Sequence, residues 1–365
     1  MQIPTSSHES GSRPAGAGDR AYQQHILPRV SRTFALTIPE LPEGLREVVA
    51  NGYLLCRIAD TLEDDPDLEG ERKRVLQQTF TDLVAGGGDP DAFAAEVVPC
   101  LSAATPADEL DLIAHTAAVI RLTRSFSAPC RAALERCVRV MCAGMPDFQA
   151  ARPRRGLDDI QEMHRYCYYV AGVVGEMLTD LFCAHAADID AQGAALRRRA
   201  VSFGQGLQMT NILKDIWDDL QRGFCWLPGD LFHRAGVDLD ELAPGRDPAG
   251  VARALGELIA IAHQHLRDAL DYTLILPARH AGIRRFCLRA VGMAVLTLRK
   301  INRHRDFTAT RQVKISRRSV AAVVAVTDRT AQHDRLLRAL FALISTGLPA
   351  PRGNRVEWEG APIAR

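Results

Sequence analysis

Residues 57–65 read RIADTLEDD, and residues 211–219 read NILKDIWDD. In both stretches, apolar residues at three- and four-residue spacing, the period of a helix, give way to several carboxylates. Burying such acids without a positive partner is unfavourable, because desolvation and mutual repulsion oppose their charged forms. The two stretches therefore predict two amphipathic helices with acidic ends, and they raise the question of which cation those ends bind.

The helical period extends over most of the chain, and no convincing series of alternating strands interrupts it. Clusters of glycine and proline mark the breaks between helices. The fold class is therefore predicted to be all-α. We expect the main helices at residues 45–63, 68–85, 107–127, 130–149, 157–185, 191–221, 248–275, 280–305 and 317–346.

The chain is expected to contain one helical domain with a flexible segment at each end. Residues 1–20 are rich in Ser, Gly, Ala and Pro and read as a disordered leader, and the polar residues 348–365 read as a flexible tail. No loop within residues 21–347 is long or biased enough to be an interdomain linker, and no repeat period is visible.

Composition favours a globular protein outside the secretory route. The 365 residues are 47% hydrophobic, enough for a sizeable core, and 45 basic residues nearly cancel 44 acidic ones, which gives no electrostatic reason to expect a nucleic-acid partner. Nine cysteines without a C-x-x-C pair indicate reduced thiols. With no signal peptide or apolar run of about 18 residues, we expect a cytoplasmic protein, with contact to a membrane surface left open.

The first acidic stretch places a polar face on an otherwise apolar helix. Tyr53, Arg57, Asp60 and Asp64 follow one another at offsets of 0, 4, 7 and 11 and share that face. Taken alone, the pattern also fits an exposed helix end with solvated acids. A second, matching stripe decides between the two interpretations.

That second stripe runs through Gln208, Asn211, Asp215 and Asp218 or Asp219 to Arg222. Carboxylates four residues apart on two helices supply the hard oxygen ligands that Mg²⁺ prefers, and they leave positions for water and phosphate oxygens. The predicted substrate is therefore a diphosphate held by bridging Mg²⁺. The predicted metal ligands are Asp60, Glu63, Asp64, Asn211, Asp215, Asp218 and Asp219.

Two other site chemistries fit the acids less well. A paired-carboxylate hydrolase needs two acids, fewer than these motifs carry. A dinuclear iron site would need an E-x-x-H pair, which neither helix has. Basic side chains at Arg32, Arg57 and Lys214 are placed to bind a diphosphate, although ordinary salt bridges to the neighbouring acids would also explain them.

Six segments in order make the chain resemble the squalene/phytoene synthase family of head-to-head prenyl transferases. They are SRTFAL at 31–36, residues 53–65, YCYYVAGVVG at 166–175, residues 208–219, Phe286-Cys287 and QVKI at 312–315. The small residues within 166–175 fit a tight helix crossing as well as a ligand site. Together the segments cover nearly the whole chain.

The resemblance implies a single-domain isoprenoid (trans-prenyl) synthase helical bundle, with the two acidic motifs facing each other across a central cavity. It implies that Mg²⁺ and two farnesyl diphosphates bind there, that presqualene diphosphate forms, and that NADPH reduces it to squalene. The implied catalytic residues are Tyr166, Asp60, Asp64, Asp215 and Asp219; the implied substrate contacts are Ser31, Arg32, Phe34, Tyr53, Arg57, Gln208, Asn211, Lys214 and Phe286; the expected NADPH contacts are Lys314, Arg317 and Arg318.

Departures from the family pattern concern mainly the reductive step. Ala290-Val291 replace a customary Pro-Gln pair, RKIN at 299–302 replaces a Cys-Tyr-Asn-Asn run, and Lys214 replaces an arginine, which keeps the charge and loses the bidentate fork. A relative that stops at presqualene diphosphate, dehydrosqualene or phytoene is the alternative enzyme. A catalytically silent helical partner protein is the alternative from another class, and the oligomeric state stays open.

Overall fold

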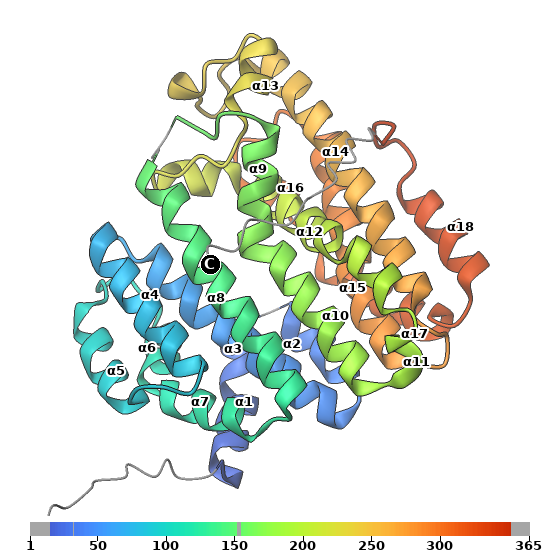
Figure 1. Ribbon diagram of the computed structural model, residues 1–365. Helices are drawn as coiled ribbons and strands as arrows, with labels where there is room; N and C mark the ends of the chain where they lie inside the picture. Colours follow the sequence, from blue (N-terminus) through green and yellow to red (C-terminus); the bar gives the residue numbers. More distant parts are fainter. Residues whose placement is uncertain (1–14, 32, 152–154, 352–365) are drawn as a thin grey trace, which may run out of the picture. The chain divides into compact units, whose positions relative to one another are not determined.

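The computed structural model describes residues 15–31, 33–151 and 155–351, and its regular elements are all helices (Figure 1). The all-α prediction is confirmed. The helices are α1 (Ala17–Val30), α2 (Phe34–Thr37), α3 (Glu43–Asp64), α4 (Gly70–Val84), α5 (Pro90–Val97), α6 (Ala107–Ala114), α7 (Thr116–Ser125), α8 (Ala128–Ala151), α9 (Ile160–Cys167), the π-helical segment η3 (Tyr168–Gly172), α10 (Val173–His185), α11 (Ala187–Asp190), α12 (Gly193–Gln221), α13 (Gly229–Arg234), α14 (Pro248–Ile275), α15 (Ala281–Arg303), α16 (Thr310–Val313), α17 (Arg317–Thr330) and α18 (Asp334–Ile344), with three short 3₁₀ turns, η1 (Ile38–Glu40), η2 (Val98–Cys100) and η4 (Leu239–Glu241).

The predicted single domain packs as two compact units. Unit 1 comprises Met1–Ile38 with Glu43–Ala143, and unit 2 comprises Pro39–Pro42 with Gly144–Arg365. Their boundary falls inside α8, so no linker in the sequence marks it. Helix α1 begins at Ala17, so the end of the stretch expected to be a disordered leader is helical.

Helix α3 is the centre of unit 1, where it packs against α1, α4, α6 and α7. Its apolar face is fully buried at Leu54, Ile58 and Leu62. A buried polar contact fixes the register of the packing: the side-chain amide of Asn51 donates to the hydroxyl of Thr123 in α7 at 2.7 Å and accepts from Gln23 of α1 at 3.3 Å. This scaffold holds the acidic end of α3.

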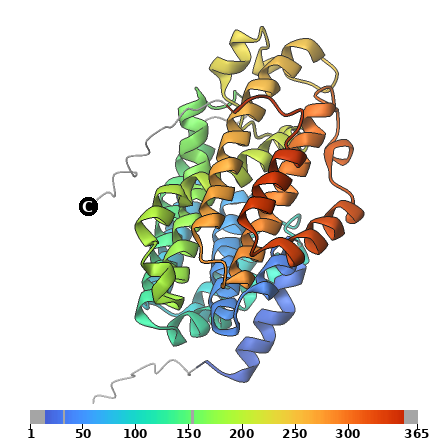
Figure 2. The ribbon, with the colours of Figure 1, turned by 90° about the vertical axis from the view of Figure 1, so that its right-hand side faces the viewer.

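Unit 2 is built around α12 and α14, which form its most extensive helix pair. Helices α10 and α15 pack on this pair, and Figure 2 shows α14 and α15 (orange) side by side with α18 (red) over them. Trp217 of α12 is buried and donates its indole N–H to the carbonyl of Phe307 at 2.7 Å, which ties α12 to the chain after α15. The second acidic stripe thus belongs to the central helix of its unit.

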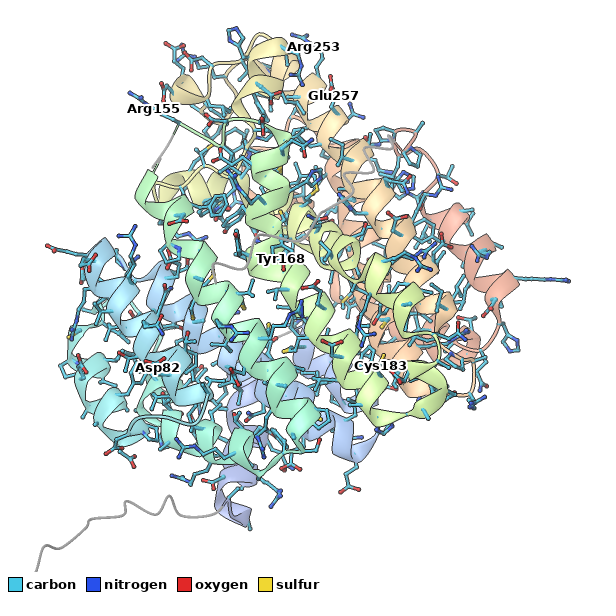
Figure 3. The ribbon with its side chains drawn as sticks, in the orientation of Figure 1. Asp82, Arg155, Tyr168, Cys183, Arg253 and Glu257 are labelled. Atoms are coloured by element: carbon cyan, nitrogen blue, oxygen red, sulfur yellow. The ribbon has the colours of Figure 1, made fainter. Side chains whose placement is uncertain are left out.

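The predicted helix at 317–346 is wrong, because the chain breaks there into α17 and α18. Arg284 explains the break: its fully buried guanidinium donates to the carbonyl of Ala331 at 3.1 Å and to the carboxylate of Asp334 at 2.6 Å. These contacts capture the end of one helix and the start of the next. The predicted helices at 107–127 and 157–185 are likewise interrupted, the second by η3, where Figure 3 labels Tyr168.

The stretch Ile160–His185, which spans α9, η3 and α10, is long and apolar enough by composition to cross a membrane. Half of its most apolar window is buried inside the protein, and core helices pass the same test of length and composition. The nine cysteines are all free, and seven of them are buried.

Glycines allow α12 to approach η3 and α10 closely. A Cβ atom on Gly204 would lie 2.1 Å from the carbonyl oxygen of Ala171, and one on Gly175 would lie 2.1 Å from that of Ala200. Both neighbours are backbone atoms, which cannot rotate away. The small residues of 171–175 therefore allow a tight helix crossing, which is one of the two roles that their sequence suggested, the other being a ligand site.

Replacing Gly204 by alanine should lower the free energy of unfolding by about 3 kcal/mol, the upper end of the usual range for overpacking. Chemical unfolding followed by circular dichroism measures the effect. The matched control is Gly44→Ala in α3, where a Cβ would meet nothing within 4 Å and where the change should be neutral or stabilising by up to about 1 kcal/mol. Equal stabilities of the two variants would contradict the close crossing.

Candidate functional site

The polar face of α3 gathers several residues that the sequence predicted for substrate binding. The hydroxyl of Tyr53 donates to the carbonyl of Val30 at 2.9 Å and accepts from the guanidinium of Arg57 at 3.0 Å. The ring of Phe34 packs on Tyr53 at 5.0 Å, and the Ser31 hydroxyl accepts from the backbone N–H of Phe34 at 3.0 Å. Unit 1 therefore brings Ser31, Phe34, Tyr53 and Arg57 together, whereas Arg32 lies outside the described residues.

Asp60 lies one turn beyond Arg57 on this face. Burial raises the pKa of its carboxyl to about 7; Arg57 opposes the rise, and the nearby carboxylates of Asp64 and Glu109 add to it. Glu109, on α6, was not predicted: its carboxylate lies 4.0 Å from Arg57 and accepts from the hydroxyl of Thr61 at 2.9 Å. Asp60 is thus a crowded, partly desolvated acid that a cation would relieve.

Two other acids of the first motif point to structural partners. Glu63 is buried and accepts from the amide of Gln77 at 2.6 Å, while Lys73 donates to its backbone carbonyl. Asp65 is buried too and accepts from the backbone N–H of Ser102 at 2.8 Å. These contacts tie α3 to α4 and to the loop before α6. A structural role for Glu63 is therefore an alternative to its predicted role as a metal ligand, and the sequence did not reveal this alternative.

The second motif lies on the C-terminal part of α12. The ammonium of Lys214 lies 3.1 Å from the carboxylate of Asp215 and donates to the side-chain carbonyl of Asn211 at 3.2 Å. Burial raises the pKa of Asp215, and Lys214 opposes the shift. Asn211 and Asp218 are exposed, Gln208 is half-buried, and Asp219 is buried and paired with Arg222.

Tyr166 lies within an aromatic stack that the sequence did not predict. Its ring lies 4.1 Å from that of Trp226, with the planes 6° apart, and the ring of Phe224 lies 5.7 Å from that of Trp226, again with the planes 6° apart. Phe148 meets Tyr166 edge-on at 5.5 Å. Trp226 and Phe224 also line a shallow hollow beside Asp219, which is too tight to enclose a water molecule. Tyrosine, aromatic wall and acidic motif therefore meet within unit 2.

The remaining predicted residues lie in two different settings. Phe286 of α15 is buried and packs edge-on against Phe182 at 6.2 Å, as a core residue does. Lys314, Arg317 and Arg318 are exposed around the start of α17. The prediction that these cations bind NADPH phosphates thus concerns accessible side chains.

His164, one turn before η3, and His265 of α14 form a buried pair. The Nε2 atoms of His164 and His265 are 3.0 Å apart, and the two side chains are 1% and 8% exposed as residues. Burial lowers the pKa of His164 to about 4; burial, then the neighbouring imidazole, lowers that of His265 to about 3. Both imidazoles are therefore neutral at neutral pH.

These shifts predict an acid-sensitive fold. Unfolded histidines titrate near 6.5, so as the pH falls from 6.5 toward 4 the unfolded chain gains protons that the native pair resists, and the free energy of unfolding decreases. The free energy of unfolding, measured from pH 6.5 to pH 4, should therefore decrease less in His164→Gln than in the wild type. The exposed His233, changed to Gln, is the control and should leave the slope unchanged. A wild-type slope retained in His164→Gln would contradict the prediction.

Each acidic motif has the donor chemistry for Mg²⁺, namely carboxylate oxygens one helical turn apart beside a basic group. The crowding around Asp60 supports this fit, because a cation would offset the repulsion that raises its pKa. Among the described residues, no group of three or more His, Cys, Asp or Glu side chains is assembled as a metal site. Oxygen atoms from a bound diphosphate and water would complete any coordination shell here.

Comparison with known proteins identifies the family. The model of the squalene/phytoene synthase family matches residues 27–319. The chain belongs to the squalene/phytoene synthase family. The matched range includes both acidic motifs and Tyr166.

Members of this family resemble the chain over most of its length. Squalene synthase from Gibberella zeae is 28% identical over 296 residues, covering 80% of this chain and 60% of that protein, and squalene synthase from Homo sapiens is 29% identical over 272 residues, covering 74% and 61%. The chain thus spans about three fifths of the length of these relatives.

Solved structures share the helical fold. A ligand complex of TcSQS aligns with a TM-score of 0.73 at 25% identity, covering 90% of this chain and 91% of that one. A dehydrosqualene synthase aligns with a TM-score of 0.60 at 20% identity, covering 85% and 95%. The fold is that of the helical isoprenoid synthases.

Proposed function

We propose that this protein is a squalene synthase, which condenses two farnesyl diphosphates head to head to presqualene diphosphate and reduces this product with NADPH to squalene. The observation that carries the proposal is the face of α3, where Arg57, held by Tyr53, lies beside the crowded carboxylate of Asp60. Membership of the squalene/phytoene synthase family and the similarity to squalene synthases support farnesyl diphosphate as the substrate.

The first step is loss of diphosphate from one substrate. Asp60 and Asp64 would hold Mg²⁺ at the first motif, and Asn211, Asp215 and Asp219 would hold Mg²⁺ at the second. Bound Mg²⁺ neutralises the charge that develops on the leaving diphosphate. Burial lowers the pKa of the Arg57 guanidinium, but Asp60, Tyr53 and Glu109 outweigh this effect, and the pKa is raised overall. Arg57 therefore keeps its positive charge, which is available to the diphosphate oxygens.

The allylic cation then adds to the double bond of the second substrate, and a proton is lost as the cyclopropane ring closes. Tyr166 would take or relay this proton through its phenol, and its ring would stabilise positive charge on the adjacent carbon atoms. The apolar and aromatic side chains around it exclude water, which would otherwise trap the cation as an alcohol.

The reductive step would use NADPH bound without a Rossmann motif. The guanidinium and ammonium groups of Lys314, Arg317 and Arg318 are accessible to its phosphates. NADPH would supply the hydride that ends the second ionisation and rearrangement.

Products formed from farnesyl diphosphate and Mg²⁺, with and without NADPH, test the proposal. We expect squalene with NADPH and presqualene diphosphate or its breakdown products without it. A product that is identical under both conditions would disprove the reductive half and leave the condensation in place. Absence of any coupled product would disprove both halves.

A thirty-carbon hydrocarbon product does not dissolve in water, so we infer that a cytoplasmic enzyme of this kind releases it at a membrane surface. Exposed apolar side chains on α17 and α18, namely Val326, Leu336 and Leu343, support such a contact. Binding to anionic vesicles, lost when Leu336 and Leu343 are changed to Ser, is the expected result.

A further inference from the structure

The loop between α12 and α13 is bonded at its end to the segment that leads into α9. The backbone N–H of Leu157 donates to the carbonyl of Leu227 at 2.8 Å, and the backbone N–H of Gly229 donates to the carbonyl of Leu157 at 2.7 Å. A third bond joins the N–H of Asp230 to the carbonyl of Asp158 at 3.0 Å. These bonds hold the end of the loop beside the start of α9.

The beginning of the same loop is tied to the second acidic motif. The backbone N–H of Phe224 donates to the carbonyl of Asp219 at 2.9 Å. Further along, Cys225 and Leu227 are 5% and 2% exposed and anchor the loop in the core. The loop is therefore held at both ends, and Trp226 lies between its two buried neighbours.

A glycine lets the loop and the segment before α9 lie this close together. Gly156 has a φ of +76°, in the left-handed region that favours glycine. A Cβ atom on Gly156 would lie 2.6 Å from the backbone carbonyl oxygen of Leu227, which cannot rotate away. The position of Trp226 relative to α9 is therefore built into the backbone of two segments.

Trp226 uses this fixed position to stack on Tyr166 of α9. The two rings lie 4.1 Å apart with their planes 6° apart, so they are in contact face to face. Phe148 of α8 packs on Tyr166 from another direction, at 5.5 Å with the planes 64° apart. Two aromatic contacts of different geometry restrict the plane of the phenol ring. Because the hydroxyl is rigidly attached to that ring, they restrict the position of the hydroxyl as well.

We propose that Trp226 is a positioning residue for Tyr166, whose phenol it holds in one place relative to the second acidic motif. This rests on the proposed function, in which Tyr166 takes or relays the proton lost on ring closure. The loop supplies the structural link, because it begins at Asp219 and is bonded at its end to the segment before α9. A proton acceptor that is displaced by about 1 Å loses much of its effect on the rate, even when the substrate binds normally. The role needs no contact between Trp226 and the substrate.

Trp226→Leu keeps an apolar side chain and removes the flat ring. We expect kcat for coupling of farnesyl diphosphate to fall about tenfold with KM unchanged, because Tyr166 is present but loosely held. Trp226→Phe restores a ring that can stack on Tyr166 and should recover most of the lost kcat. A leucine variant as active as the wild type, or a phenylalanine variant no better than the leucine variant, would overturn the proposal.

Phe232→Leu is the matched control for lost packing. Phe232 of α13 is fully buried in the core against which Tyr166 and Trp226 pack. Its replacement should lower the unfolding midpoint and leave kcat unchanged. A loss of kcat in Phe232→Leu as large as that in Trp226→Leu would assign the effect to packing and overturn the positioning role.

A double-mutant cycle tests whether Trp226 acts through the hydroxyl of Tyr166. Trp226→Leu added to Tyr166→Phe should cause no further loss of kcat, because the group that Trp226 positions is already gone. The same tenfold loss with and without the hydroxyl would show two independent effects and overturn the proposal.

NMR of the tyrosine rings tests the stacking without any assay of activity. The face of an indole shields the protons of a ring stacked on it, so the ring resonances of Tyr166, assigned by their loss in Tyr166→Phe, should move downfield in Trp226→Leu. They should stay in place in Phe232→Leu. Unchanged Tyr166 resonances in Trp226→Leu would overturn the proposal. If the wild type makes no coupled product, the proposed function fails, and the resonances still show whether Trp226 holds Tyr166.

Discussion

Asparagine in place of Asp60 should reduce the formation of coupled product by at least about two orders of magnitude, the size of effect expected when a group that stabilises transition-state charge is removed. The side chain keeps its shape and loses the negative charge that would hold Mg²⁺ against the leaving diphosphate. Because burial and neighbouring acids raise the pKa of Asp60 to about 7, the same change should leave the apo protein at least as stable as the wild type.

Initial rates with farnesyl diphosphate at several Mg²⁺ concentrations measure this effect. Asp215→Asn in the second motif should cause a comparable loss, since burial also raises the pKa of that carboxyl. Glu43→Gln is the matched control, because Glu43 is an exposed acid in the first turn of the same helix α3. Near-normal rates in Asp60→Asn and Asp215→Asn would remove the basis for metal binding by the two motifs.

Tyr166→Phe is the second change with a large expected effect. Phenylalanine keeps the ring stacked on Trp226 and loses only the hydroxyl, so the fold and the aromatic wall should persist. If the phenol handles the proton lost on ring closure, kcat should fall by about 10² or more, while KM changes little. Steady-state kinetics and the unfolding midpoint, measured together, separate lost chemistry from lost stability.

The neighbouring tyrosine provides the control for this experiment. Tyr169 lies three residues further along, packs on Phe148 at 5.9 Å and belongs to the same helical stretch. Tyr169→Phe should keep the wild-type kcat. Equal losses in Tyr166→Phe and Tyr169→Phe would assign the effect to packing, and the catalytic role of Tyr166 would then fail.

The helix period was enough to predict α3, α12 and α14, because each keeps one apolar stripe over many turns. It could not predict the break between α17 and α18, since the cause is Arg284, a side chain about 50 residues away that captures Ala331 and Asp334. Nor could it predict two units, because their boundary lies inside α8 and no linker composition marks it.

At the candidate site, spacing on one helix identified Tyr53, Arg57 and Asp60 as neighbours, and the structure places them so. Spacing did not distinguish Asp60 from Glu63, because the difference lies in what α4 brings to Glu63, namely Gln77. Residues supplied by distant segments were missed for the same reason.

Glu109 beside Arg57 and Trp226 on Tyr166 are two such residues. Trp226 follows an acidic helix end and a Gly-containing turn. An aromatic residue at this position was the sequence feature from which its place beside Tyr166 could have been predicted. The resemblance to a known family predicted more candidate site residues than composition or periodicity did, because it compares positions on different helices at once.

The proposed function requires that this chain join two farnesyl diphosphates. Incubation of the purified protein with farnesyl diphosphate and Mg²⁺, followed by analysis of the extracted products, tests it most directly. We expect a thirty-carbon coupled product and release of inorganic diphosphate, both abolished when EDTA removes the metal. Recovery of unreacted substrate, or of farnesol alone, would contradict it.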